Sequence, residues 1–276
     1  MDDAFDLDAY LARIGYGGER APTLDTLSAV HLAHAQSIPF ENLDPLLRRP
    51  VPLDAAALQA KLVRGGRGGW CFEQNSLLRH ALHALGFRTT ALVGRVLWNV
   101  SLPAGGVTSR SHMLLLVHLD DGDRLADVGF GSQTLTAPLR LVPNEAQPTP
   151  HGPFRLAPLD GGELAVEARV GDAWKALYRF DRQPQHTLDY EVASWYLCTH
   201  PRSSFLTNLV AARAEPGGRR VLRNNVLTVY RTDGAPVSRA LGSAAEIRDA
   251  LVREFGIAPP DAPDLEPALA RVAAMT

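Results

Sequence analysis

The 276-residue sequence has only two cysteines, Cys71 and Cys198, and no large excess of charge of either sign. Two cysteines are too few for a disulfide framework, so each is a candidate free thiol. A formal net charge of -2 provides no general field that would attract nucleic acid or an anionic membrane. We therefore expect no nucleic-acid partner, because any basic patch would have to be local.

Long apolar runs are also missing from the sequence. No uninterrupted apolar stretch approaches the roughly 18 residues that a membrane span needs. The acidic start, MDDAFDLDAY, lacks the basic and apolar regions of a secretory signal. We expect a cytoplasmic protein with no membrane partner, in which both thiols stay reduced. Apolar residues make up 46% of the chain, which is ordinary for a sequence that folds throughout.

Three kinds of pattern follow one another along the chain. From Asp6 to about Phe87 apolar residues recur three and four positions apart, which is typical of helices. From Arg88 to about Tyr190 the period shortens toward two, which predicts an antiparallel barrel or sandwich. The last part mixes a hairpin at Asn224-Asn225 with a helix whose capping box runs from Ser243 to Glu246. The sequence thus predicts three parts, 1–87, 88–190 and 191–276, in an α+β fold.

The stretch RGGRGGWCFEQN, residues 64–75, places Cys71 between a glycine-rich loop and an amphipathic helix. The unpaired N–H groups and the positive dipole end of that helix would face its sulfur and favour the thiolate form. The same N–H groups could hold the oxyanion formed when a carbonyl is attacked. We expect Gly68 and Gly69 to let a substrate carbonyl approach the backbone closely. Cys198, in WYLCTHP, fits a small buried hydrophobic residue instead.

The arginines of the same stretch suggest two other interpretations. An RNA-binding RGG segment would use Arg64 and Arg67, but it needs repeated units in a disordered basic region. A phosphate-binding loop needs a Gly-Lys-Ser/Thr end and a preceding strand, and neither is present. We interpret Arg64 and Arg67 as charges that anchor the loop.

A nucleophilic cysteine needs a base, and His112 is the best candidate among nine histidines. It opens SHMLLLVHL, the most apolar strand, so its imidazole should enter a protected interior, although a core histidine bonded to a carbonyl would fit as well. His31 and His34, and likewise His80 and His83, lie three apart on helices. Because no cysteine or carboxylate has matching spacing, we expect solvated or capping histidines and no metal site.

Asp127 is the candidate orienting group, because a carboxylate among apolar residues in LADVGFG is costly unless it is paired. Asp120-Asp121-Gly122 predicts a hairpin between the two strands. A four-residue loop from Leu119 to Gly122 makes facing residue numbers sum to 241, and Asp127 then becomes a diagonal neighbour of His112. We predict this register, since an even sum would put the two groups on opposite faces.

With Cys71, His112 and Asp127 in this order, the sequence resembles the arylamine N-acetyltransferases. The match is carried by YLARIGY, IPFENL, RGGRGGWCFEQN, GRVLW, SHMLLLV, ADVGFG and HPRSSFLTN, and it becomes loose after about Leu209. The resemblance implies a helical bundle, a β-barrel and a C-terminal α/β lid around a papain-like or transglutaminase-like core. It also implies acetyl transfer from acetyl-CoA through an acetyl-cysteine to an arylamine, arylhydrazine or N-hydroxyarylamine.

The same resemblance assigns roles position by position. Cys71 would be the nucleophile, His112 the base and Asp127 its orienting group. The acceptor slot would be lined by Phe40, Val96, Phe130 and Phe205. Ser111 and the backbone of Phe130 and Gly131 would contact the pantetheine arm of CoA.

Other functions share these motifs. An amide synthase of polyketide biosynthesis belongs to the same family, and a papain-like or transglutaminase-like hydrolase would use the same triad. The pyrophosphate-binding loop of the other large acetyltransferase family is missing, which favours a covalent route over direct transfer from CoA. The phosphate contacts of CoA stay open, with Arg219 and Arg220 as candidates by charge alone, and so does the oligomeric state.

Overall fold

Helices form the first part of the chain, as the apolar spacing predicts. The computed structural model describes residues 5–101, 103 and 106–275, so that the first four residues of the acidic start lie outside the described residues. A left-handed Gly86 follows the last of these helices, in the stop position that the sequence indicates. The helices are α1 (Leu7–Ile14), α2 (Leu24–Ser37), α3 (Leu43–Leu46), α4 (Ala55–Leu58), a π-helix (Gln59–Arg64) and α5 (Cys71–Ala84).

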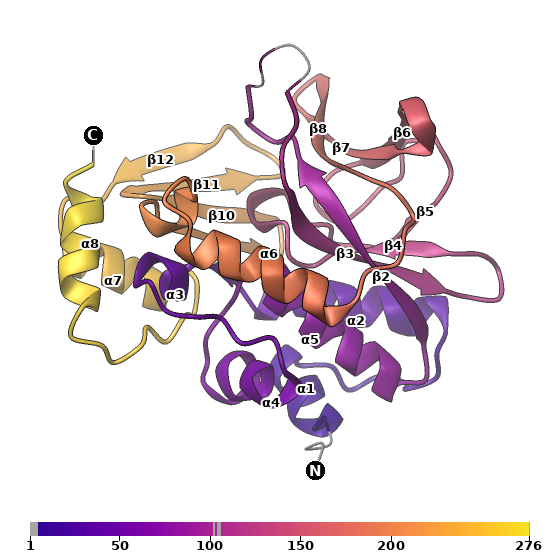
Figure 1. Cartoon of the computed structure of the whole chain (residues 1–276), viewed down its shortest axis with the longest axis horizontal. Helices are drawn as coiled ribbons and strands as arrows, with labels where there is room; N and C mark the ends of the chain where they lie inside the picture. Colours follow the sequence, from indigo (N-terminus) through magenta and orange to yellow (C-terminus); the bar gives the residue numbers. More distant parts are fainter. Residues whose placement is uncertain (1–4, 102, 104–105, 276) are drawn as a thin grey trace.

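The middle of the chain forms a seven-stranded antiparallel sheet in the order β5-β4-β3-β2-β8-β7-β6 (Figure 1). Isolated bridges from Pro143 to Leu156 and from Gln147 to Phe154 join the segment after β5 to β6, so the sheet curls into a nearly closed barrel. The strands are β2 (Arg88–Val96), β3 (Arg110–His118), β4 (Arg124–Ala126), β5 (Leu139–Arg140), β6 (Phe154–Pro158), β7 (Leu164–Val170) and β8 (Ala173–Phe180).

The register of the β3–β4 hairpin is the predicted one. Leu115 faces Ala126 and Leu116 faces Leu125, so facing numbers sum to 241. The turn is closed by a hydrogen bond from the N–H of Gly122 to the carbonyl of Leu119 at 3.1 Å. The four-residue loop is therefore confirmed, and it places residue 127 on the same face of the sheet as residue 112.

A second antiparallel sheet has the order β1-β9-β10-β11-β12, and its first strand comes from the N-terminal part of the chain. The predicted hairpin is confirmed, because Arg223 faces Val226 across a turn at Asn224-Asn225. Ser243 caps the following helix, as predicted, by accepting the N–H of Glu246. These elements are β1 (Phe40–Glu41), β9 (Val210–Glu215), β10 (Gly218–Arg223), β11 (Val226–Arg231), β12 (Val237–Ala240), α7 (Ala244–Arg253) and α8 (Leu265–Ala273).

One long helix, α6 (Thr187–Thr199), has no counterpart in the predicted pattern, and the expected boundary at residue 190 falls inside it. It lies on the near side of the molecule in Figure 1 and packs against β3. Tyr190, Leu197 and Cys198 form its buried side. Within the described residues, no helix is both long and apolar enough to cross a bilayer.

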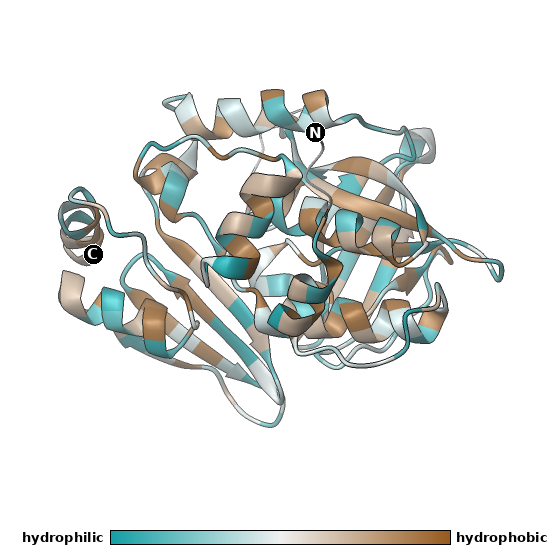
Figure 2. Ribbon diagram, turned by 90° about the horizontal axis from the view of Figure 1, so that it is seen from below, coloured by the Kyte–Doolittle hydropathy of each residue, from teal (hydrophilic) through white to brown (hydrophobic). Residues whose placement is uncertain are grey.

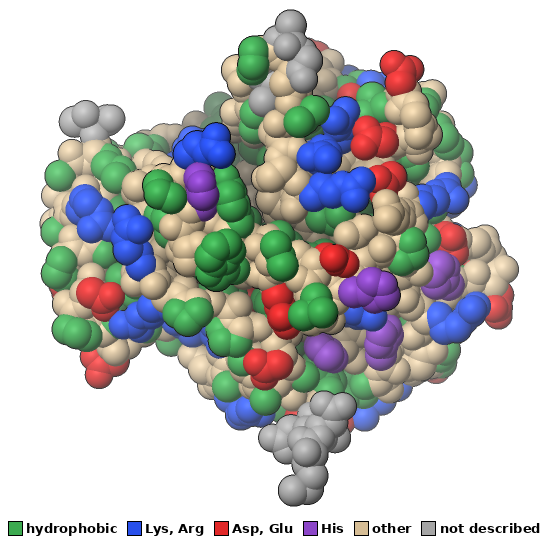
Figure 3. Space-filling view, viewed as in Figure 1, with side chains coloured by type: hydrophobic (Ala, Val, Ile, Leu, Met, Phe, Trp, Pro, Cys, Tyr) green, Lys and Arg blue, Asp and Glu red, His purple; other side chains and the backbone are tan. Residues whose placement is uncertain are grey.

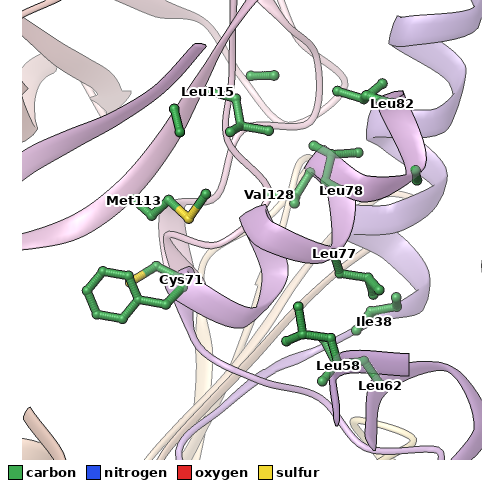
Figure 4. Close-up of a cluster of buried hydrophobic side chains, with 14 of the residues drawn as sticks. Ile38, Leu58, Leu62, Cys71, Leu77, Leu78, Leu82, Met113, Leu115 and Val128 are labelled. Atoms are coloured by element: carbon green, nitrogen blue, oxygen red, sulfur yellow. The ribbon is translucent and has the colours of Figure 1, made fainter. Parts of the chain in front are cut away.

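Three hydrophobic clusters hold these layers together. The first lies between the N-terminal helices and the inner face of β2 and β3, the second between β9–β11 and α7–α8, and the third inside the barrel. Hydrophobic positions accordingly run along the packed faces of helices and strands in Figure 2. Figure 4 shows Cys71 at the start of α5, at the edge of the first cluster, with Leu77, Leu78 and Leu82 further along the same helix. The nucleophile candidate is thus fixed on a well-packed helix.

Candidate active site

Cys71 is the first residue of α5, which confirms that a helix begins at this cysteine. Its side chain is buried against β3, with the sulfur 3.5 Å from the backbone carbonyl of Ser111. The side chain of Glu73 accepts the N–H of Trp70 at 3.1 Å and so fixes the turn before the cysteine. The first N–H groups of the helix have no partner within it, so the sulfur lies at the positive end of the α5 dipole.

The glycines before Cys71 have a different role from the one expected. A Cβ at Gly68 would lie 2.1 Å from the carbonyl oxygen of Pro39, and one at Gly69 would lie 2.5 Å from a carboxylate oxygen of Glu73. Their small size therefore lets β1 and α5 approach the loop. Gly129 supplies the clearance next to Cys71, since a Cβ at Gly129 would lie 2.7 Å from Cα of Cys71.

A buried cluster of charges lies under this loop. Arg67 pairs with Glu41 at 2.7 Å and with Asp44 at 3.2 Å, while Lys61 pairs with Asp44 at 2.5 Å and with Glu73 at 2.6 Å. Arg67 thus anchors the loop, as we predicted from the sequence. Arg64, by contrast, is exposed and has no ion pair with the described residues.

His112 and Asp127 form a buried hydrogen-bonded pair, with Nε2 of His112 2.7 Å from Oδ2 of Asp127. The other carboxylate oxygen accepts hydrogen bonds from Nδ2 of Asn75 and from the N–H of Gly129, both at 2.9 Å. Because Nε2 is held by the carboxylate, Nδ1 is the ring nitrogen left for Cys71.

The charges of this pair follow from its surroundings. Burial lowers the pKa of His112, but the negative charge and hydrogen bond of Asp127, with a smaller contribution from Cys71, outweigh burial and raise this pKa to about 10. Burial raises the pKa of Asp127, and His112, Asn75 and Gly129 together bring it below its ordinary value. At neutral pH the pair is therefore an imidazolium and a carboxylate, which places a positive charge beside Cys71.

Two further residues belong to this arrangement, and their part in it was not predicted. Asn75 lies one helical turn after Cys71 and bridges the strands, since its Nδ2 also donates to the carbonyl of Met113 at 2.8 Å. Its spacing of four from the cysteine was the available signal. Tyr178 on β8 is fully buried, and its ring lies 4.5 Å from that of His112. Burial and the nearby charge of Asp127 raise the pKa of Tyr178 well above its usual value. We find no sequence signal for this residue.

The expectation that His31 and His34 are solvated or capping residues is wrong. Both are fully buried, and Nε2 of His31 accepts the backbone N–H of Asp127 at 3.2 Å. Burial lowers the pKa of His31 to about 4, so the imidazole is neutral and can act as an acceptor. His34 bonds to Tyr10 at 2.8 Å and to Gln74 at 2.7 Å. The helical spacing of three placed both rings on the packed face of α2, against α5 and the strand end at Asp127.

A cavity of about 580 Å³ opens above Cys71 and His112, between the two sheets. All of the residues proposed for the acceptor slot and the pantetheine arm line it: Phe40, Val96, Ser111, Phe130, Gly131 and Phe205. Its far wall was not predicted and comes mainly from the C-terminal sheet, with Val221, Arg223, Asn224, Asn225, Val226, Thr228 and Tyr230.

Arg219 and Arg220, the candidates by charge alone for the phosphate contacts of CoA, both bind groups of the protein itself. Arg219 is buried and donates to the carbonyl of Thr134 at 2.9 Å, after the short turn (Gly131–Gln133) on the cavity wall. Arg220 pairs with Glu215 at 2.8 Å and with Glu254. Arg223 is the arginine of β10 that lines the cavity.

Comparison with known proteins decides the family. A family model described as N-acetyltransferase matches residues 23–261. The chain belongs to the arylamine N-acetyltransferase family. It is 46% identical over 261 residues to an arylamine N-acetyltransferase of Mycolicibacterium smegmatis, with 92% of both chains covered.

Solved structures of the family share the fold. The M. smegmatis arylamine N-acetyltransferase structure matches with a TM-score of 0.93 at 43% identity, covering 99% of this chain and all of that one. The Mycobacterium marinum enzyme, solved in complex with CoA, matches with a TM-score of 0.91 at 40% identity, covering 97% of this chain and 99% of the other. The α+β fold and the family resemblance are thus confirmed. Across the described part of the chain, no three His, Cys, Asp or Glu side chains are arranged to hold a metal ion.

Proposed function

We propose that this enzyme transfers an acetyl group from acetyl-CoA to an arylamine, arylhydrazine or N-hydroxyarylamine through an acetyl-Cys71 intermediate. One observation carries the proposal. Cys71, at the start of α5, and His112, which is hydrogen-bonded to Asp127, lie side by side in the lining of one cavity. The CoA complex of the M. marinum relative supports acetyl-CoA as the donor.

In the first half-reaction, the Cys71 thiolate attacks the thioester carbonyl of acetyl-CoA. The positive charge on His112 stabilises the thiolate before attack, and the N–H groups at the start of α5 face the developing oxyanion. Collapse of the tetrahedral intermediate breaks the bond to the CoA sulfur, which leaves as a thiol after taking a proton from His112. One thioester replaces another, so little driving force is needed.

In the second half-reaction, the acceptor nitrogen attacks the acetyl-cysteine carbonyl. An arylamine is uncharged at neutral pH, so its lone pair is available. The neutral His112 left by the first step accepts the proton that becomes acidic as the C–N bond forms, and Cys71 leaves as the thiolate. Asp127 keeps the ring oriented and stabilises the imidazolium that this step restores.

The cavity walls suit an aromatic acceptor. Phe40, Val96, Phe130 and Phe205 give it apolar sides near the cysteine, which bind a ring and keep water from the acyl-enzyme. We assign Ser111 and the backbone of Phe130 and Gly131 to the pantetheine arm, which must pass them to bring its thioester to Cys71.

Mass spectrometry of the intact enzyme and of its peptides tests this proposal. After mixing with acetyl-CoA in the absence of an acceptor, we expect one acetyl group on the Cys71 peptide and none on the Cys198 peptide, because Cys198 lies on the buried side of α6. An arylamine should then remove the acetyl group and appear as the N-acetyl product. Cys71→Ala should gain no acetyl group. Product formation by Cys71→Ala, or acetylation elsewhere, would contradict the covalent route.

A further inference from the structure

The outer face of α6 carries a stripe of exposed apolar side chains. Leu188, Val192 and Trp195 are 71%, 67% and 68% exposed, and their spacing of four and three puts them on one face of the helix. Figure 3 shows hydrophobic side chains in the middle of the face on which Figure 1 places α6. Exposed apolar side chains gathered on one helix face are typical of an interaction surface, and tryptophan is enriched among residues that dominate binding energy.

A groove of about 440 Å³ runs beside this stripe. Its walls are residues 50–53, Pro-Val-Pro-Leu, on one side and Ser194, Trp195 and Cys198 of α6 on the other. The groove is apolar along residues 50–53, and it is separate from the catalytic cavity, with which it shares no lining residue. The stripe and the groove together form one surface, on which the exposed Trp195 side chain stands next to the groove.

Two opposite charges on the same groove are left without a partner in the described part of the chain, whereas a further carboxylate of the groove, that of Asp54, accepts the N–H of Ala57 at 2.9 Å at the start of α4. Arg48 and Glu191 both line it, both are exposed, and neither forms an ion pair with any described residue, including the other. Their neighbour Arg49, in contrast, pairs with Asp264 at 3.0 Å. Arg48 and Glu191 thus give the groove one unpaired cation and one unpaired anion, next to the exposed side chain of Trp195.

We propose that this surface binds a second copy of the chain in a two-fold symmetric dimer. A two-fold interface brings the same patch together from both molecules, so the patch must complement itself. Here the α6 helices would pack antiparallel, Trp195 of each copy would enter the groove of the other, and Arg48 of each copy would pair with Glu191 of the other. A partner of different sequence would need to reproduce all three features, whereas a second copy already has them.

Sedimentation velocity of the full chain over a wide concentration range tests the dimer. We expect a reversible monomer–dimer equilibrium, and Trp195→Glu should raise the dimer Kd about 30-fold or more because a central aromatic anchor is lost. The matched control is Val237→Glu, which changes a similarly exposed apolar residue on β12 and should leave the Kd unchanged. A chain that stays monomeric throughout, or a dimer that tolerates Trp195→Glu, would overturn the proposal.

Charge reversal identifies the contacts. Arg48→Glu and Glu191→Arg should each weaken the dimer about tenfold, because each places like charges together across the two-fold axis. The double variant restores opposite charges and should return the Kd to within about threefold of the original. Failure of the double variant to recover affinity, with each single variant weakened, would overturn the assigned pairing. None of these residues lines the catalytic cavity, so acetylation of Cys71 is an independent check that each variant is folded.

Discussion

At the scale of single residues, the charge of the Asp127 carboxylate controls the protonation of His112. The carboxylate is fully buried, and each of its oxygens has a hydrogen-bond partner. The backbone N–H of Asp127 donates to the neutral ring of His31. Burying such a charge is costly unless it is paired, so we attribute its presence to its effect on the protonation of His112. That effect is the raised pKa of His112, which burial alone would have lowered.

Replacement of this carboxylate gives the first prediction. Asp127→Asn preserves the shape but removes the charge, so the pKa of His112 should fall and the acetylation rate of Cys71 at pH 7 should drop by about 10²- to 10⁴-fold. Rapid-quench kinetics with acetyl-CoA measures the rate. Asp123→Asn is the matched control, because it removes the carboxylate 2.8 Å from His118, a pair that does not line the cavity. Equal rates for Asp127→Asn and the original chain would contradict the role.

At the scale of elements, the start of α5 depends on charges brought by four segments. Glu73 on α5 is buried with Lys61 from the π-helix, Asp44 from α3 and Glu41 from β1. Burial raises the pKa of Glu73 to about 7, and Lys61 offsets only part of this rise. The folded state therefore retains a proton on Glu73 that the unfolded chain has already lost, over the range from its ordinary pKa of 4.5 to about 7.

This shift predicts how stability changes with pH. As pH rises from about 4.5 to 7, the contribution of Glu73 to the free energy of unfolding falls, because ionisation is easier in the unfolded chain. Glu73→Gln cannot titrate, so the original chain should lose on the order of 1–3 kcal/mol relative to the variant between pH 5 and pH 8. Urea unfolding at both pH values measures this difference, with Glu167→Gln as a control that removes a carboxylate paired with Arg155 outside the cluster. A difference that grows in the opposite direction would refute the assignment.

The elements also show what the sequence could and could not predict. The β3–β4 register followed from a turn signal and the cost of burying Asp127, both of which are local in sequence. The pairing of Phe40 with Ala212 joins residues far apart, and a two-residue strand leaves no periodic pattern, so β1 was not foreseen. His31 and His34 were misplaced because a helical spacing of three fits a buried face as well as a solvated one. Their burial depends on partners contributed by α5 and the end of β4.

At the scale of the whole molecule, the cavity exists only because two sheets meet over α5. Cys71, His112 and most of its near wall come from the first 133 positions, with Phe205 added after α6, whereas much of its far wall comes from β10 and β11. β1 joins the two halves, since Phe40 both pairs with β9 and lines the cavity. The C-terminal third, where the sequence resemblance is loose, therefore shapes the space that a long donor must occupy while the chemistry stays with the other parts.

Because the far wall and the proposed catalytic residues come from different parts of the chain, we predict that the far wall can be altered without changing Cys71, His112 or Asp127. Val221 and Thr228 face each other across β10 and β11, and both line the cavity. Val221→Trp should narrow the far end and raise the KM for acetyl-CoA about tenfold or more, since the long donor loses room there. Acetylation of Cys71 by a small activated acetyl ester, which needs only the near end, should change by less than about twofold. Val237→Trp, on β12 outside the cavity, is the matched control. Equal losses with both donors would place the effect of Val221 at the reacting residues and contradict the division.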